Sequence, residues 1–191
     1  MTHPERLVVG ISGASGAVYG IRLLEVLRNS GIETHLVISK AAGMALKEET
    51  GRSVSDVRAL ATVSYPTDDV GAAIASGSFR TRGMIVAPCS VKTLGEIAHG
   101  ITPSLLPRAA DVVLKERRRL VLMVRETPLH LGHLRNMVQV TEMGAIVAPP
   151  VPGFYSGATT LEEMVDQTVG RALDLFDIDL GLVKRWKDNA S

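Results

Sequence analysis

The chain has 191 residues, of which 46% are hydrophobic and 21% are charged, and its 21 basic and 20 acidic residues leave a net charge of +1. This composition predicts one globular domain, excludes a disordered chain and disfavours nucleic acid as a partner, because there is no basic excess. With Cys89 as its only cysteine and no export signal expected, the chain fits a reducing, cytoplasmic setting. Three prolines interrupt the longest uncharged stretch, 143–161, so we expect no membrane partner.

Short apolar runs alternate along the chain with amphipathic stretches. The apolar runs are continuous, which is typical of strands covered on both faces, and they predict strands at 7–11, 34–38, 84–87, 120–124 and 145–147. The amphipathic stretches predict helices at 17–29, 40–50, 92–98, 109–117, 131–142 and 160–176, the last opened by a capping-box pattern at Thr160 and Glu163. This alternation predicts an α/β fold, a three-layer α/β/α Rossmann-like (flavodoxin-like) parallel sheet. We expect a single domain over 1–191, with segment 177–191 packing on a neighbour.

The carboxyl ends of the strands in such a sheet meet at one edge, where ligands bind. After the first strand, the small residues of 12–17 let a ligand reach the backbone, and the following helix offers free N–H groups to a phosphate. The segment is neither a dinucleotide fingerprint nor a Walker A loop, and its simplest interpretation is a tight turn. Similar helix starts follow the second strand at Ser39 and the third at 90–93. Together they predict a phosphorylated cofactor, a phosphorylated substrate or both.

Charged and aromatic side chains follow the last two strands. Arg125 and Glu126 come directly after the fourth strand, where an arginine fork suits phosphate or carboxylate, although the two could simply form a surface ion pair. Tyr155 follows a proline-rich segment after the fifth strand, in a position that favours ligand contact over packing alone. Arg108 and Lys115 are two helical turns apart and therefore share a helix face.

Five further residues have a structural interpretation beside the functional one. Glu49 lies near a helix end, where carboxylates are usually solvated, and Arg171 lies on an apolar helix face where its stem could pack. We interpret Cys89 as a small buried residue rather than a nucleophile, because no partner histidine is evident. His130 and His133 are close in sequence but lack a third ligand, so we expect no metal.

The combination of these segments resembles the UbiX family of flavin prenyltransferases, also named as the B subunit of phenolic acid decarboxylases, from Leu7 to Trp186. Each segment is short, but their order and spacing together are specific. The segments that carry the resemblance are 13–17, 38–40, 49–50, 75–78, 88–90, 108–111, 114–116, 152–155 and Arg171. Segment 70–74 departs from the family pattern. Some relatives have a tryptophan shortly before the Ser-Gly-Ser segment, which is 76–78 here, and this chain has no aromatic residue in 70–74.

This resemblance implies an enzyme that joins a dimethylallyl group from dimethylallyl phosphate to N5 and C6 of reduced FMN, without a metal, and supplies prenylated FMN to a UbiD-type decarboxylase. It also implies a homododecamer with sites at subunit contacts. The residues implied to bind FMN are Gly13, Ala14, Ser15, Ser39, Ser90, Val91, Lys92, Thr93 and Arg125. Those implied to bind dimethylallyl phosphate are Arg108, Lys115, Arg125, Glu126, Tyr155 and Arg171. The implied catalytic residues are Ser15, Glu49, Glu126 and Lys115.

Four other functions remain open. A related FMN enzyme oxidatively decarboxylates a cysteine group, but the sequence lacks the asparagine-rich loop and the histidine expected there. The second is an FMN-binding accessory subunit of a phenolic acid decarboxylase. The third is a flavodoxin-like electron carrier, which would have no use for the set Arg108, Lys115, Tyr155 and Arg171. The fourth is the decarboxylase itself, although no residue here suggests independent acid chemistry. The sequence leaves open which decarboxylase is served, and whether the donor is a monophosphate or a diphosphate.

Overall fold

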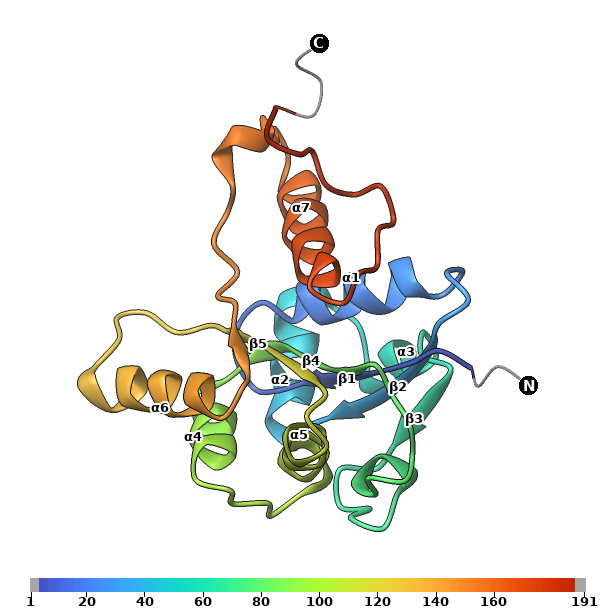
Figure 1. Ribbon diagram of the computed structural model, residues 1–191. Coiled ribbons are helices and arrows are strands. Elements are labelled where there is room, and N and C mark those ends of the chain that lie inside the picture. Colours follow the sequence, from blue (N-terminus) through green and yellow to red (C-terminus); the bar gives the residue numbers. More distant parts are fainter. Residues whose placement is uncertain (1–3, 188–191) are drawn as a thin grey trace.

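The computed structural model describes residues 4–187 and has three layers, with a central sheet between two layers of helices (Figure 1). Every strand pairs in parallel with its neighbours, in the order β3-β2-β1-β4-β5-β6. The strands are β1 (Arg6–Ile11), β2 (Glu33–Ile38), β3 (Val63–Tyr65), β4 (Gly83–Cys89), β5 (Arg119–Val124) and β6 (Ile146–Val147). The order reverses between β1 and β4, so the carboxyl ends of these two strands open the crevice in which such sheets bind ligands. The expected fold class is confirmed.

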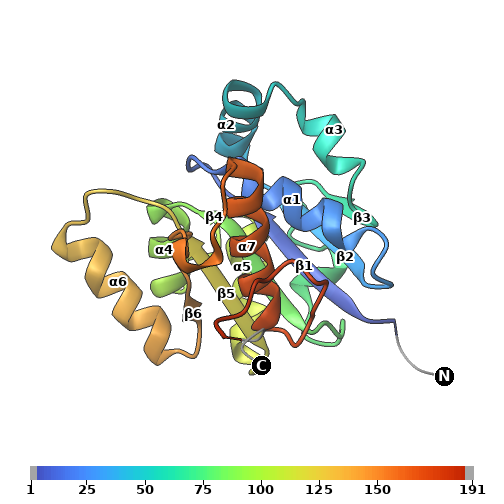
Figure 2. The ribbon, with the colours of Figure 1, turned by 90° about the horizontal axis from the view of Figure 1, so that it is seen from above.

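The helices cover both faces of the sheet (Figure 2). One face carries α1 (Ala17–Leu27), α2 (Lys40–Thr50), α3 (Val54–Arg58) and α7 (Leu161–Asp174). The other carries α4 (Val91–Ala98), α5 (Leu105–Lys115) and α6 (Leu131–Glu142), with a short 3-10 turn at Ala73–Ala75. A second 3-10 turn, Phe154–Ser156, lies beside α7, where Tyr155 contacts Gln167. Within residues 4–187, no helix has the length and apolar character needed to cross a membrane.

Side chains of β1 alternate between the two layers. Leu7 and Val9 are fully buried under the α1 face, while Val8 packs with the α4 and α5 face. Both faces of β1 are therefore covered, which explains why its sequence is continuously apolar.

The structure contains two elements that the sequence pattern missed. β3 has only three residues and lies at the sheet edge with Val63 exposed, so it lacks a buried apolar run. α3 is a single short helix whose Ser53 and Asp56 form a capping box.

α5 begins at Leu105 and not at 109 as predicted. Pro107 lies in its first turn, where the missing N–H of proline costs no hydrogen bond.

Gly20 lets α1 lie directly on β4. A Cβ built on Gly20 would lie 2.3 Å from the carbonyl oxygen of Ala87 and 2.8 Å from Ile11 Cδ1. A glycine is therefore required for this approach, which places the start of α1 beside the end of β4 at the ligand-binding edge.

Candidate functional site

Ser12 fastens two of the strand-end turns together. Its backbone N–H and its hydroxyl donate to the carbonyl oxygen of Pro88 at 3.1 and 2.9 Å, and its Oγ accepts from the backbone N–H of Ser90 at 2.7 Å. Ser12 is only 1% exposed, so these bonds are shielded from water. They fix the turn after β1 against the turn after β4, and Ser12 was not among the candidates predicted from the sequence.

The turns after β1, β2 and β4 line a hollow of about 390 Å³. Ser39 caps α2 by accepting from Ala42 N, and buried Ser90 caps α4 by accepting from Thr93 N. Each cap takes one first-turn amide, which leaves the other orphan amides of the two helix starts for an anion. The predicted FMN residues that line this hollow are Gly13, Ser39, Ser90, Lys92 and Thr93.

Two other residues predicted to bind FMN, Ala14 and Val91, are next in sequence to residues that line this hollow. Ala14 is half-buried, and its backbone N–H donates to the carbonyl oxygen of Ser12 at 2.9 Å. Val91 is the first residue of α4. Lys92 is largely exposed, and its ammonium pairs with Glu96 one turn along the helix. These positions are compatible with backbone contacts to a phosphate.

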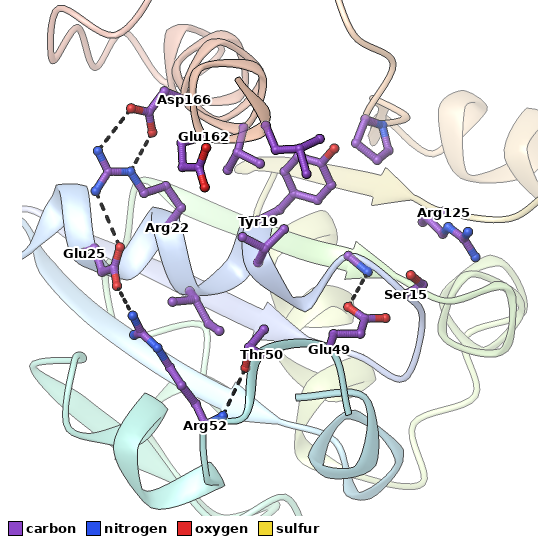
Figure 3. Close-up of a pocket in the computed structure, with 16 residues that line it drawn as sticks. Ser15, Tyr19, Arg22, Glu25, Glu49, Thr50, Arg52, Arg125, Glu162 and Asp166 are labelled. Atoms are coloured by element: carbon purple, nitrogen blue, oxygen red, sulfur yellow. Dashed lines mark hydrogen bonds and ion pairs between the residues drawn. The ribbon is translucent and has the colours of Figure 1, made fainter. Parts of the chain in front are cut away.

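A second and larger cavity of about 900 Å³ lies beside α1 and α7 and contains Ser15, Glu49 and Arg125 (Figure 3). One carboxylate oxygen of Glu49, Oε2, accepts from the backbone N–H groups of Gly16 and Ala17 at 2.9 and 3.1 Å. Glu49 thus caps the start of α1 from the end of α2, where the positive end of the helix dipole favours its charge. The cap brings Glu49 next to the turn that carries Ser15.

The far end of this cavity is a ladder of ion pairs. Arg22 donates to Asp166 at 2.5 Å and to Glu25 at 3.4 Å, and Arg52 pairs with Glu25 at 2.8 Å (Figure 3). The ladder joins α1, α7 and the segment after α2, so the charges of these four residues are satisfied by one another.

Arg125 and Glu126 do not form the surface ion pair that was the alternative interpretation. The carboxylate of Glu126 accepts from the backbone N–H of Thr127 at 3.0 Å. Among the described residues, none forms an ion pair with Arg125, whose backbone N–H donates to the carbonyl oxygen of Cys89 at 3.0 Å. The guanidinium is therefore positioned at the cavity edge with its donors available.

Tyr155 and Arg171 line a third hollow of about 300 Å³, together with Gln167. Both side chains are more than half exposed. This hollow adjoins the larger cavity, because Pro149 lines the hollow and the next residue, Pro150, lines the cavity. Five of the predicted substrate and catalytic residues, Ser15, Glu49, Arg125, Tyr155 and Arg171, thus lie in two adjoining hollows.

Arg108 and Lys115 are not brought to these hollows within one chain. Arg108 lies in the first turn of α5 and pairs with Asp111 at 2.8 Å. Lys115 is the last residue of α5, about 10 Å further along the helix axis. Its ammonium pairs with Glu116 and lies beside Gly77, where a Cβ would come within 2.8 Å of it. The face that the two cations share points away from the α1 side of the sheet.

The structural interpretations of Cys89 and the two histidines agree with the geometry. Cys89 is fully buried, and burial raises the pKa of its thiol. His130 accepts from the backbone N–H groups of Gly132 and His133 as the cap of α6. Its ring stacks on that of His133 with centroids 3.5 Å apart. Among residues 4–187, no group of three or more histidine, cysteine or acidic side chains could hold a metal ion.

Only one of the two hydrogen bonds of the predicted capping box forms at the start of α7. Thr160 accepts from Glu163 N, but the carboxylate of Glu163 accepts from Thr159 N instead of from the cap residue.

Residues 177–187 of the C-terminal segment pack against α7 of the same chain, while 188–191 lie outside the described residues. Contact of this segment with a neighbouring copy stays a prediction.

The comparisons first define a class. Residues 1–173 match the model of a family described as Flavoprotein. This agrees with a three-layer sheet whose turns present helix starts and hydroxyls at the crevice.

Closer relatives define the family within this class. The chain is 58% identical over 186 residues to the flavin prenyltransferase UbiX of Escherichia coli K12, covering 96% of this chain and 98% of that protein. It is 57% identical over 184 residues to the protein of the same name from Thauera aromatica, covering 96% and 95%. The chain belongs to the UbiX flavin prenyltransferase family.

Solved structures agree with this assignment. The structure described as AnUbiX (PadA1) in complex with FMN and dimethylallyl pyrophosphate is 53% identical with a TM-score of 0.95, covering 96% of this chain and 98% of that one. An FMN-dependent cysteine decarboxylase, TvaF, is 18% identical with a TM-score of 0.65 and so shares the fold alone. The resemblance found in the sequence is confirmed, and the cysteine decarboxylase alternative is not favoured.

Proposed function

We propose that this chain transfers a dimethylallyl group from dimethylallyl phosphate to reduced FMN. The observation that carries the proposal is that an anion-binding crevice for a flavin phosphate occurs together with two adjoining hollows, the larger lined by Arg125 and the smaller by Tyr155 and Arg171. An electron carrier needs only the first of these. Relatives that are 57% and 58% identical over nearly their whole length are named flavin prenyltransferases, which supports the same activity here.

The crevice residues fit FMN. Its phosphate would be held by the helix starts at Ser39 and Ser90, with Thr93 and the glycine turn at Gly13 beside them. Arg125 would lie where the flavin ring reaches the larger cavity. When bound and reduced, FMN supplies the nitrogen and carbon atoms to which the five-carbon group is joined.

The cations stabilise the departure of phosphate. As the bond between the dimethylallyl carbon and the phosphate oxygen breaks, negative charge grows on that oxygen. Arg108, Lys115 and Arg171 hold this charge more strongly in the transition state than in the ground state. Ser15 and Glu49 hold and move the proton near the flavin, and Glu126 shares the released proton with the phosphate. Tyr155 binds the phosphate and helps to exclude water.

Two copies of the chain build each site. Arg108, which is partly buried, and Lys115, which is exposed, lie on α5 apart from the hollow that contains Arg171. A neighbouring copy would supply them, which agrees with a site at a subunit contact. A relative from Escherichia coli O157:H7 with a TM-score of 0.92 and 48% identity, covering 95% of this chain and 98% of that one, is described as dodecameric. We propose a homododecamer for this chain as well.

The product would serve a UbiD-type decarboxylase, which requires a prenylated flavin that it does not make. We place the chain in the cytoplasm, where a single buried thiol such as Cys89 stays reduced.

The direct test is a single incubation without oxygen. The purified protein is mixed with reduced FMN and dimethylallyl phosphate, and the mass of the released flavin is measured. A gain of one five-carbon unit is the expected result. Unchanged flavin that stays bound to the protein would instead favour an electron carrier or an accessory subunit. Dimethylallyl diphosphate in a parallel incubation tests which donor the site accepts.

Activity should not depend on a divalent metal. The arginine and lysine side chains neutralise the leaving phosphate, so they replace the cation that many phosphate-leaving reactions require. We expect the rate to change less than about twofold when a chelator such as EDTA is added. The rate is measured as flavin product per minute, with and without added magnesium. A loss of activity restored by magnesium would contradict this assignment.

A further inference from the structure

The strap, defined here as residues 182–186, lies along α7 beside the hollow that contains Tyr155 and Arg171. Lys184 is fixed by buried Gln167 of α7, whose side-chain oxygen accepts from Lys184 N at 2.8 Å and whose Nε2 donates to Lys184 O at 3.2 Å. Gly170 of α7 makes room for the strap, because a Cβ there would lie 2.6 Å from Val183 Cγ2. The strap is therefore seated on α7 by its backbone and by close packing.

The strap contacts Tyr155 directly and is connected to Arg171 through Asp174. The Trp186 ring packs edge-on against Tyr155, with ring centroids 5.6 Å apart. Gln167, which holds the strap, also reaches the Tyr155 hydroxyl at 3.5 Å. Two turns further along α7, Asp174 binds both Arg185 of the strap and Arg171.

Asp174 is shared unequally between two arginines. Arg185 of the strap binds both of its carboxylate oxygens at 2.9 Å, in the two-pronged geometry that suits an arginine and a carboxylate. Arg171 donates to only one of them, at 2.5 Å. The Asp174 side chain is 14% exposed, and hydrogen bonds from Arg185 and then Arg171 hold its pKa below the ordinary value.

This sharing leaves Arg171 with donors to spare. If Arg185 were absent, Arg171 could turn and bind both oxygens of Asp174, and its charge and its donors would be withdrawn from the hollow. We propose that Arg185 is a positioning residue, which occupies Asp174 so that Arg171 stays free to bind the phosphate of the prenyl donor. This inference rests on the proposed function, in which Arg171 binds that phosphate.

The test separates donor binding from turnover. Binding of dimethylallyl phosphate is measured by calorimetry on the protein loaded with oxidised FMN, which cannot react, and KM and kcat are measured with reduced FMN. Arg185→Gln should weaken binding and raise KM by about tenfold with a smaller change in kcat, which corresponds to roughly one lost charge-assisted contact. Arg185→Lys keeps the charge but not the two-pronged geometry. Its donor affinity should lie between those of the unsubstituted protein and Arg185→Gln.

A double variant distinguishes a positioning role of Arg185 from a role in holding the strap in place. In Asp174→Asn/Arg185→Gln the carboxylate that captures Arg171 is gone, so donor binding should recover toward the unsubstituted protein. If the pair only holds the strap in place, the double variant should bind as weakly as Arg185→Gln or more weakly, and that outcome would overturn the proposal.

Asp179 provides a matched control. It is the second carboxylate partner of Arg185, at 3.0 Å, and it does not contact Arg171. Asp179→Asn should leave the dissociation constant unchanged. Equal binding by Arg185→Gln and the unsubstituted protein would reject the role of Arg185 while leaving the proposed function intact. Binding without any prenylated product would reject the proposed reaction alone.

Discussion

Replacing Glu49 by glutamine should lower kcat for flavin prenylation by about 100- to 1,000-fold, the loss expected when a group that transfers a proton is removed. Glutamine still offers a side-chain oxygen to the backbone N–H groups of Gly16 and Ala17, so the cap of α1 is kept. The amide cannot take up and release the proton. FMN affinity, measured by quenching of flavin fluorescence, should change little, because the phosphate-binding turns are untouched.

Glu48 is the matched control for this prediction. It precedes Glu49 on α2, is exposed and lines none of the three hollows. Glu48→Gln should retain the full rate. If Glu49→Gln were equally active, the proton-transfer role would have to be assigned elsewhere, and the carboxylate would serve only as a helix cap.

Replacing Gly20 by alanine should destabilise the protein by about 3 kcal/mol, the upper part of the range for overpacking a close-packed interior. The added methyl group would lie 2.3 Å from the carbonyl oxygen of Ala87, so α1 must move away from β4. For a chain of this length the melting temperature should fall by roughly 6–12 °C. Because the start of α1 is part of the site, FMN affinity should fall as well. Calorimetry and flavin titration measure the two effects.

Gly95 provides the comparison, because it is also a glycine inside a helix. A Cβ at Gly95 would meet only Asn136 Nδ2 at an ordinary 3.5 Å. Gly95→Ala should therefore be neutral or stabilise the protein by about 0.5–1 kcal/mol through the higher helix propensity of alanine. Equal effects of the two substitutions would show that the close approach of α1 to β4 does not govern stability.

The sequence predicted the layers of the fold because each long strand is covered on both faces and is therefore continuously apolar. β3 escaped prediction because an exposed three-residue edge strand has no such run. Ser15, Glu49 and Arg125 share one cavity because strand-end turns in a parallel sheet meet at one edge. Glu49 itself, at the end of a helix, could be linked to this edge only through the family resemblance.

Residues that act through others left no signal in the sequence. Ser12 is one serine in a run of small residues, and its three hydrogen bonds to Pro88 and Ser90 depend on a turn 76 to 78 positions away. Asp174 and Arg185 are separated by a bend of the chain whose path no periodicity describes. The sequence predicted the helix face on which Lys115 lies. It could not predict where Lys115 lies relative to Arg171, because that depends on how the copies assemble.

The central claim of this account is that each active site combines Glu49 of one copy with Lys115 of another. It is tested most directly by co-expressing two inactive variants, Glu49→Gln and Lys115→Met, with different affinity tags, and purifying the assemblies that carry both tags. If the site is shared, random mixing leaves both residues intact in about a quarter of the sites, and about a quarter of the activity should return. Mixed assemblies no more active than either variant alone would contradict the claim, because every chain would then carry a defect in its own site.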